Sequence, residues 1–227
     1  MSVFFLRPGT RALASLALLA SLTATHASAG DFTGAHLGVL LGYERGSAEV
    51  GDIAPEITGA IIGAEVGANY QFDSGLVLGV ALDAAYSTSS GHVMDGKYMR
   101  FEGEGEASVQ LLGRIGYAVD SVLPYLTAGV GYMKSTSTMI CAASATNGDC
   151  KYFPLGFETS STVERVGYVV GAGLEVALNE SVSLKAEYLY ADYGTEPLTL
   201  HLPESTELTN DVKMSASTVR TGLLFRF

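Results

Sequence analysis

The sequence predicts an eight-stranded antiparallel β-barrel that crosses a membrane, and three observations support this fold class. Segments in which apolar and polar residues alternate recur along the chain, which is typical of strands and not of helices. The connections between these segments alternate between tight turns and long polar stretches. One face of most strands is apolar, whereas the opposite face consists of glycine with occasional charged residues.

The alternation is clearest in residues 181–194, where Val182, Leu184 and Ala186 alternate with Ser183, Lys185 and Glu187. Most segments of this kind approach or exceed the roughly 9–11 residues that a tilted strand needs to cross a bilayer. The predicted strands are 33–43, 58–72, 75–86, 105–119, 123–133, 163–178, 181–193 and 214–227.

The connections predict which kind of barrel this is. Three of them are short and rich in Asp, Asn, Ser and Gly, as tight turns are. The other four are long and polar, and short turns at one end with long loops at the other are typical of outer-membrane barrels, where the turns are periplasmic and the loops extracellular. The predicted turns are 72–75, 119–122 and 178–181, and the predicted loops are 44–57, 87–104, 134–162 and 194–213.

The two strand faces predict which side meets lipid. On one face the second strand carries Ile62 and Val66, and on the other Gly63, Glu65 and Gly67. Glycine is disfavoured within strands unless something approaches closely, and the lumen of an eight-stranded barrel is only just wide enough for side chains. We therefore expect the glycine-and-charge face to point inward and the apolar face to meet lipid.

Charged side chains on the inner face fall near mid-height. Buried charges are tolerated when they are paired and hydrogen-bonded, so we expect the pairs Glu175–Lys185, Glu187–Arg220 and Asp83–Arg114. One interpretation is a proton or ion path, and the other, which we favour in so narrow a barrel, is a satisfied ionic core that plugs the lumen. The predicted network comprises Glu65, Asp83, Arg114, Glu175, Lys185, Glu187 and Arg220.

Aromatic residues on the apolar face fall at two heights, as expected of the interfacial girdles of a membrane barrel. The girdle near the long loops comprises Tyr43, Tyr86, Tyr132, Tyr168 and Tyr190. The girdle near the tight turns comprises Tyr70, Phe72, Tyr117, Phe225 and Phe227.

The first residues predict a cleaved signal peptide. Arg7 and Arg11 precede an apolar run over 12–22, and residues 27–29 read Ala-Ser-Ala, a small-x-small cleavage pattern. We expect a signal peptide over 1–29 and one barrel domain over 30–227. Removal of the two leader arginines leaves 11 basic and 24 acidic residues, a net charge of −13, which argues against nucleic-acid binding.

The chain resembles the small opacity-type outer-membrane proteins, which belong with the OmpA-like transmembrane barrels. Residues 170–190 (VGAGLEVALNESVSLKAEYLY) resemble their penultimate hairpin, 220–227 (RTGLLFRF) their last strand, and 32–38 (FTGAHLG) their opening strand. The resemblance implies an eight-stranded barrel in the outer membrane of a Gram-negative cell, with surface-exposed, antigenic loops. It also implies that Phe227 is part of a signal read by the barrel-assembly machinery.

The predicted loops offer few chemical groups. Cys141 and Cys150 are the only cysteines, and in an exported chain they are expected to form a disulfide, either shaping a binding tip or protecting the loop. Some members of the resembled family bind haem, so His92 and His201 are weighed as haem ligands, but solvated loop residues are the better interpretation. We expect no metal and no cofactor.

We therefore expect a non-catalytic barrel that serves envelope integrity and surface presentation. His201 and Ser205 share a loop, but no strand or elbow frames them for acyl transfer. The expected partners are outer-membrane lipid and lipopolysaccharide, the barrel-assembly machinery and, as an alternative, a host surface protein. The remaining alternatives are an adhesin or ligand receptor that acts through its loops, and a small-solute porin.

Overall fold

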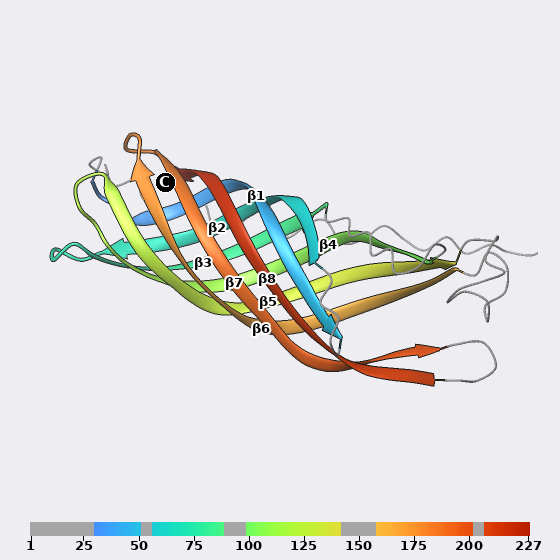
Figure 1. The fold of residues 1–227 in the computed structure, drawn as a ribbon. Helices are drawn as coiled ribbons and strands as arrows, with labels where there is room; N and C mark the ends of the chain where they lie inside the picture. The colour runs from blue at the N-terminus through green and yellow to red at the C-terminus, as the bar shows by residue number, and fades with distance from the viewer. Residues whose placement is uncertain (1–29, 51–55, 89–98, 142–157, 202–206) are drawn as a thin grey trace, which may run out of the picture.

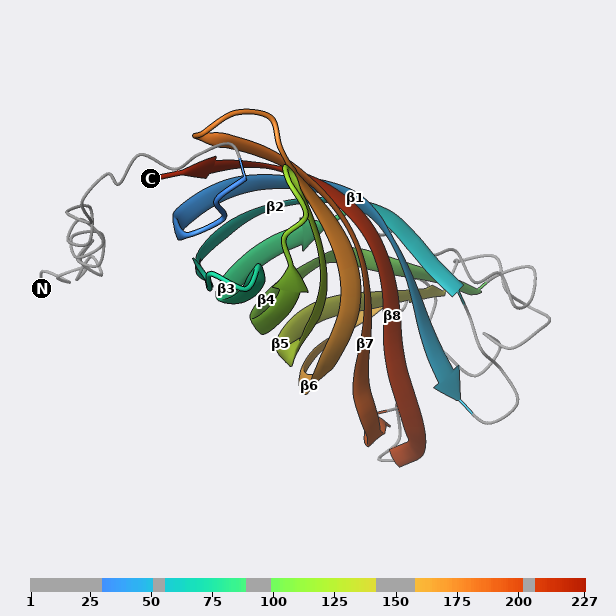
Figure 2. The same cartoon turned by 90° about the vertical axis from the view of Figure 1, so that its left-hand side faces the viewer.

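Eight antiparallel strands form a single closed barrel in the computed structural model (Figures 1 and 2). The structure describes residues 30–50, 56–88, 99–141, 158–201 and 207–227, so the predicted signal peptide lies outside the described residues. The strands are β1 (Gly34–Val50), β2 (Glu56–Gln71), β3 (Leu76–Ser87), β4 (Met99–Tyr117), β5 (Val122–Cys141), β6 (Glu158–Ala177), β7 (Val182–His201) and β8 (Glu207–Arg226).

The barrel closes because β8 pairs with β1 as well as with β7. Each strand lies antiparallel to its neighbour in sequence, and the β1–β8 ladder runs from His36–Arg226 to Val50–Val212. Closure pairs the backbone groups of the wall between strands, which is the condition for spanning a bilayer with β-structure. The predicted fold class is confirmed. The described part of the chain contains no helix long and apolar enough to cross a membrane.

Three short turns connect the strands at 72–75, 118–121 and 178–181, the second of them one residue before its predicted range, and residues suited to turns form them. Gly75 adopts a φ of 86° and Asp120 a φ of 52°, both in the left-handed region, which glycine and aspartate tolerate better than other residues. In the third turn the Asn179 side-chain oxygen accepts hydrogen bonds of 2.9 Å from the backbone N–H groups of Ser181 and Val182. Such side-chain to backbone bonds favour the chain reversal.

At the opposite end the strands extend farther than predicted. β5 continues to Cys141 instead of ending at 133, and β8 begins at Glu207 instead of 214. The predicted loop boundaries were wrong because the apolar signal on the outer face stops at the membrane edge. Backbone pairing does not need that signal, and the β5–β6 ladder continues through residues such as Thr136 and Thr162, whose hydroxyls lie 3.2 Å apart.

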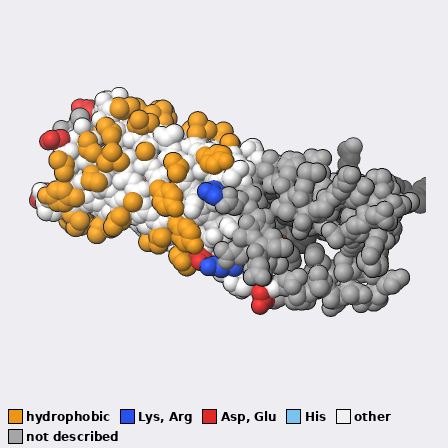
Figure 3. Space-filling model, viewed as in Figure 1, with side chains coloured by type: hydrophobic (Ala, Val, Ile, Leu, Met, Phe, Trp, Pro, Cys, Tyr) orange, Lys and Arg blue, Asp and Glu red, His pale blue; other side chains and the backbone are white. Residues whose placement is uncertain are grey.

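Outward and inward side chains differ in solvent exposure, as the two strand faces predict. Along β3 the exposed fraction is 59% for Val80 but 5% for Ala81, the next residue. Hydrophobic side chains cover the visible barrel wall in Figure 3, and charged side chains lie at both ends of that band. An apolar outer belt around a charged interior reverses the pattern of a water-soluble barrel and matches a lipid-facing one.

This orientation predicts opposite reactivity at adjacent positions of β3. In a C141S/C150S background, V80C should react with a lipid-soluble maleimide in the folded barrel, because position 80 faces the bilayer. A81C should react only after unfolding, because position 81 is packed inside. Mass spectrometry of folded and denatured protein measures the labelled fraction, and equal labelling of both folded variants would contradict the assigned faces.

Candidate functional site: the charged lumen

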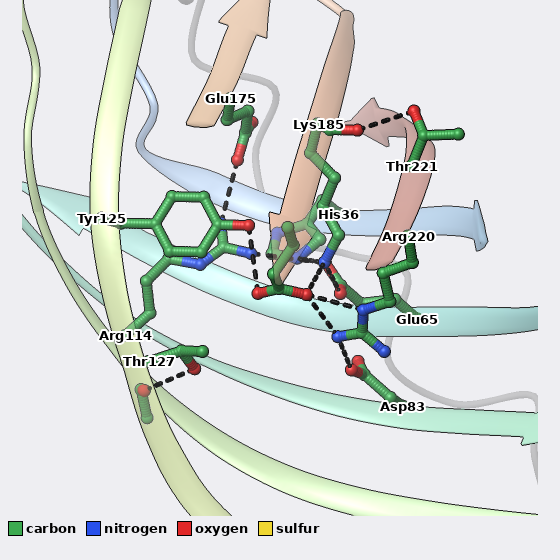
Figure 4. Close-up of polar contacts among 12 residues, drawn as sticks. His36, Glu65, Asp83, Arg114, Tyr125, Thr127, Glu175, Lys185, Arg220 and Thr221 are labelled. Carbon is green, nitrogen blue, oxygen red and sulfur yellow. Dashed lines mark hydrogen bonds and ion pairs between the residues drawn. The ribbon is translucent and has the colours of Figure 1, made fainter. Parts of the chain in front are cut away.

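Polar side chains from all eight strands meet at mid-height in the lumen (Figure 4). They are buried, and Glu65, Glu175 and Lys185 are almost completely inaccessible to solvent. Each residue reaches the centre because the two-residue period of a strand directs it inward, while its chain neighbours face lipid. The set comprises His36, Glu65, Asp83, Arg114, Tyr125, Glu175, Lys185, Glu187 and Arg220.

Glu65 is the acceptor at one side of this network. Its Oε2 accepts a hydrogen bond from Lys185 Nζ, and its Oε1 lies 3.6 Å from Arg114 Nη2 and 3.1 Å from His36 Nε2. Because a carboxylate oxygen only accepts, His36 donates through Nε2. One carboxylate therefore connects side chains from four strands.

Glu187 is the second acceptor. Arg220 lies 2.6 Å from its Oε2 and Lys185 lies 3.4 Å from the same atom, while the Tyr125 hydroxyl donates to its Oε1 at 3.1 Å. Arg220 also donates to Asp83 across the lumen. Lys185 and Arg220 are each shared between two carboxylates, so these contacts form one continuous network.

Arg114 extends the network toward β6. It donates to Glu175 at 2.9 Å, and its guanidinium lies 4.2 Å from the centroid of the Tyr125 ring, within range of a cation–π interaction. The network contains four carboxylates, Glu65, Asp83, Glu175 and Glu187, against three permanent cations. His36 supplies the fourth basic side chain and is bonded directly to a carboxylate.

Apolar layers cover the network on both sides. Toward the short turns lies a buried cluster that includes Phe32, Val77 and Leu123. Toward the long connections lies another, which includes Met133, Val169 and Leu189. The ion pairs are thus enclosed by lipid around the wall and by hydrocarbon above and below, where low polarity strengthens their attraction.

The base of the barrel is closed by the segment before β1. Phe32 is fully buried, and its backbone N–H donates to the Gln71 side chain at 2.9 Å. Arg226 lies against the Phe32 ring, 5.2 Å from its centroid, and donates to the backbone oxygens of Asp31 and Asn179. These residues are not among the predicted site residues, although the inward phase of β8 indicates Arg226.

The structure brings all the predicted lumen charges together but changes two of the predicted pairs. Glu187 and Arg220 pair as expected. Asp83 and Arg114 do not meet, because the register places Asp83 opposite Gln110, four residues or about 13 Å along the strand from Arg114. Glu175 and Lys185 are register partners, yet their charged ends pair with Arg114 and with Glu65 and Glu187.

Tyr125 and His36 complete the network. Neither residue belongs to the predicted network, which contains only Asp, Glu, Lys and Arg side chains. The inward positions of β5, at Leu123, Tyr125 and Thr127, are the signal that indicates Tyr125.

The predicted girdle residues lie on the outer face, half-buried at Tyr190 and exposed at the others. Tyr70 and Phe72 pack edge to face at the turn end, with ring centroids 4.9 Å apart. His92, Cys150 and Ser205 lie outside the described residues, and the side chains of Cys141 and His201 are not described either. No group of three or more His, Cys, Asp or Glu residues in the described ranges is arranged to hold a metal ion.

Sequence comparison assigns the chain to a protein family. Residues 14–227 match the family model described as the outer membrane protein beta-barrel domain. The chain belongs to this family. It is therefore an outer-membrane protein, as predicted from its two strand faces.

Proteins with similar sequences are also named as outer-membrane proteins. The 31 kDa outer-membrane immunogenic protein of Brucella melitensis is 29% identical over 216 residues, covering 87% of this chain and 84% of that protein. The 25 kDa outer-membrane immunogenic protein of Brucella canis is 32% identical over 200 residues, covering 87% and 80%. Among solved structures, OprG of Pseudomonas aeruginosa aligns with a TM-score of 0.49 at 15% identity, over 88% of this chain and 99% of that one.

The network predicts that neutralising a buried carboxylate destabilises the barrel far more than neutralising an exposed one. E65Q neutralises the carboxylate that pairs with Lys185 and His36 and lies beside Arg114. Lys185 then keeps only its longer contact to Glu187, and Arg114 keeps only Glu175, so we expect the free energy of unfolding to fall by about 3–5 kcal/mol. Urea unfolding of the refolded barrel in detergent, followed by the heat-modifiable shift in gel mobility, measures the change.

The matched control is E164Q. Glu164 bonds Lys134 at 2.9 Å on the outer face beyond the loop-side girdle, and this hydrogen bond lowers the pKa of Glu164. Both side chains are about half exposed, so removing this charge should leave the unfolding midpoint unchanged within error. Equal effects of the two substitutions would contradict a stabilising lumen network.

Proposed function

We propose that this protein is a non-conducting, non-catalytic barrel that strengthens the outer membrane and presents its long connections at the cell surface. The observation that carries the proposal is the ion-pair network closed by apolar layers on both sides. A hydrated ion crossing this lumen would have to displace both apolar layers and separate ion pairs whose charged ends are almost fully buried. The same features argue against the porin alternative.

The orientation of the barrel follows from its asymmetry. The short turns are proposed to face the periplasm and the connections at residues 51–55, 88–98, 142–157 and 202–206 the exterior, as in other outer-membrane barrels. The proposed partners at the outer face are lipid and lipopolysaccharide, and Phe227 is proposed to be read by the barrel-assembly machinery during insertion. The names of the relatives, which describe immunogenic outer-membrane proteins, support surface presentation.

The plugged lumen predicts the absence of steady conductance. Purified barrel inserted into a planar bilayer in 1 M salt should give no sustained current steps at voltages of about 100 mV, because both apolar layers exclude water. A F32A/L189A variant, which thins both layers but keeps the ion pairs, should open more often than the native barrel. Sustained native openings that scale with salt concentration would contradict the proposal.

Surface presentation predicts the accessibility of inserted epitopes. A tag placed within 142–149 should bind antibody on intact cells, because this connection is proposed to be extracellular. The same tag between Asp73 and Ser74, in the first short turn, should bind only after the outer membrane is permeabilised. Flow cytometry before and after permeabilisation measures both, and antibody binding to the Asp73–Ser74 tag on intact cells would overturn the orientation.

A further inference from the structure

The barrel wall opens between β6 and β7 at the end opposite the short turns. Their ladder ends at the pair Tyr168–Asp192, although β6 extends to Glu158 and β7 to His201. Beyond that pair, β6 continues beside β5 and β7 beside β8, and Figure 1 shows the β7–β8 hairpin running apart from β5–β6. An irregularity between Asp192 and Thr195 directs β7 away, with Gly194 at a φ of 73°.

Arg165 lies beside this opening, and no ion pair joins it to a carboxylate among the residues that the structure describes. Its side chain points inward from β6 and is only 3% exposed. Nη2 contacts the backbone oxygen of Glu196 at 3.5 Å, across the opening, while Nε and Nη1 have no hydrogen-bond partner within the described ranges. A guanidinium remains charged in proteins, so burying it without an anion costs several kcal/mol.

Glycines lie next to Arg165 and Met133 above the apolar layer. The partner of Arg165 in β5 is Met133, and the next inward residues on the two strands are Gly167 and Gly131, which have no side chains. A Cβ at Gly131 would lie 3.0 Å from Val169 Cγ2 and 3.6 Å from Gln110 Cγ, and a Cβ at Gly167 would lie 2.1 Å from the backbone oxygen of Asp192, so glycine lets these groups approach closely. The Gln110 side-chain oxygen is buried and also has no donor among the described residues.

We propose that this end of the lumen is an oxyanion-binding site, in which the Arg165 guanidinium binds a phosphate or carboxylate group that enters beside the last β6–β7 pair. The two unpaired nitrogens Nε and Nη1 form one edge of the guanidinium fork, and this edge matches two oxygens of such a group. Gln110 accepts a hydroxyl or ammonium proton of the same ligand. The apolar layer that contains Met133 and Val169 forms the floor, so the site is separate from the ion-pair network and needs no pore.

The test measures anion-dependent stability with inorganic phosphate as the probe. Barrel refolded in lipopolysaccharide-free detergent is heated with increasing phosphate at constant ionic strength, and the midpoint of the gel-mobility shift is recorded. A ligand that binds only the folded state raises this midpoint. We expect a saturable rise for native protein and for K134Q, which removes an outward cation at similar height, and no rise for R165Q.

Two further measurements keep the proposal testable if R165Q folds poorly. R165K keeps the charge but loses the fork, so phosphate binding should weaken about tenfold. The Arg165 Nε–H resonance in a ¹⁵N spectrum of the native barrel should shift saturably with phosphate. No shift of this resonance, or an equal rise of the midpoint in R165Q and native protein, would overturn the proposal.

The source of the anion is tested in a second arm. Acetate in place of phosphate reports whether a carboxylate suffices, and lipopolysaccharide in mixed micelles reports whether a lipid headgroup reaches the opening. Displacement of phosphate by lipopolysaccharide would support a headgroup as the source of the oxyanion, and its failure to compete would support a dissolved one. Without anion, R165Q should be at least as stable as the native protein, because an unpaired buried charge has been removed.

Discussion

Charge inside a lipid-enclosed lumen must be neutralised by other strands, and this constraint ties the whole barrel together. Lys185 on β7 is completely buried, and Glu65, the carboxylate that its Nζ contacts most closely, comes from β2. A one-residue slip of any strand exchanges its two faces. For β7, such a slip would place Lys185 in lipid and remove one of the two cations that contact Glu65. The network therefore specifies the register of each strand in addition to stabilising the closed wall.

The apolar layers decide what this network does for the protein. Salt bridges open to water contribute little, and charged rings around a wet channel select ions. Here Phe32 and Leu123 close one side and Val169 and Leu189 the other, so the charges interact in a dry compartment. Breaking such a pair leaves an uncompensated buried charge, and the barrel is held in one geometry. This arrangement suits a rigid wall and not a gated path.

The sequence could predict which side chains of the barrel wall face outward, because this depends only on the pattern of neighbouring residues. Each outward valine or leucine reports a face through its immediate neighbours, as Val80 and Ala81 do. The partners of the lumen charges could not be predicted in the same way, since Asp83 meets Arg220 across the lumen, 137 residues away. That contact depends on the stagger of all the strands between them. Beyond the loop-side girdle the outward positions are polar, as at Thr136 and Lys213, so an apolar outer face no longer marks where β5 ends and β8 begins.

The same interactions divide the barrel into two parts. The part on the side of the short turns specifies the fold, whereas the part on the side of the long connections tolerates more variation in sequence. Below Tyr168–Asp192 each strand is paired on both sides and the lumen is filled. Above it, β6 and β7 separate, and the stability of the barrel no longer depends on what lies between them. An unpaired arginine can persist at this boundary because the ion pairs and apolar layers below it already hold the fold. Sites for external ligands are therefore more easily accommodated there than in the ionic layer, where each charge has a structural partner.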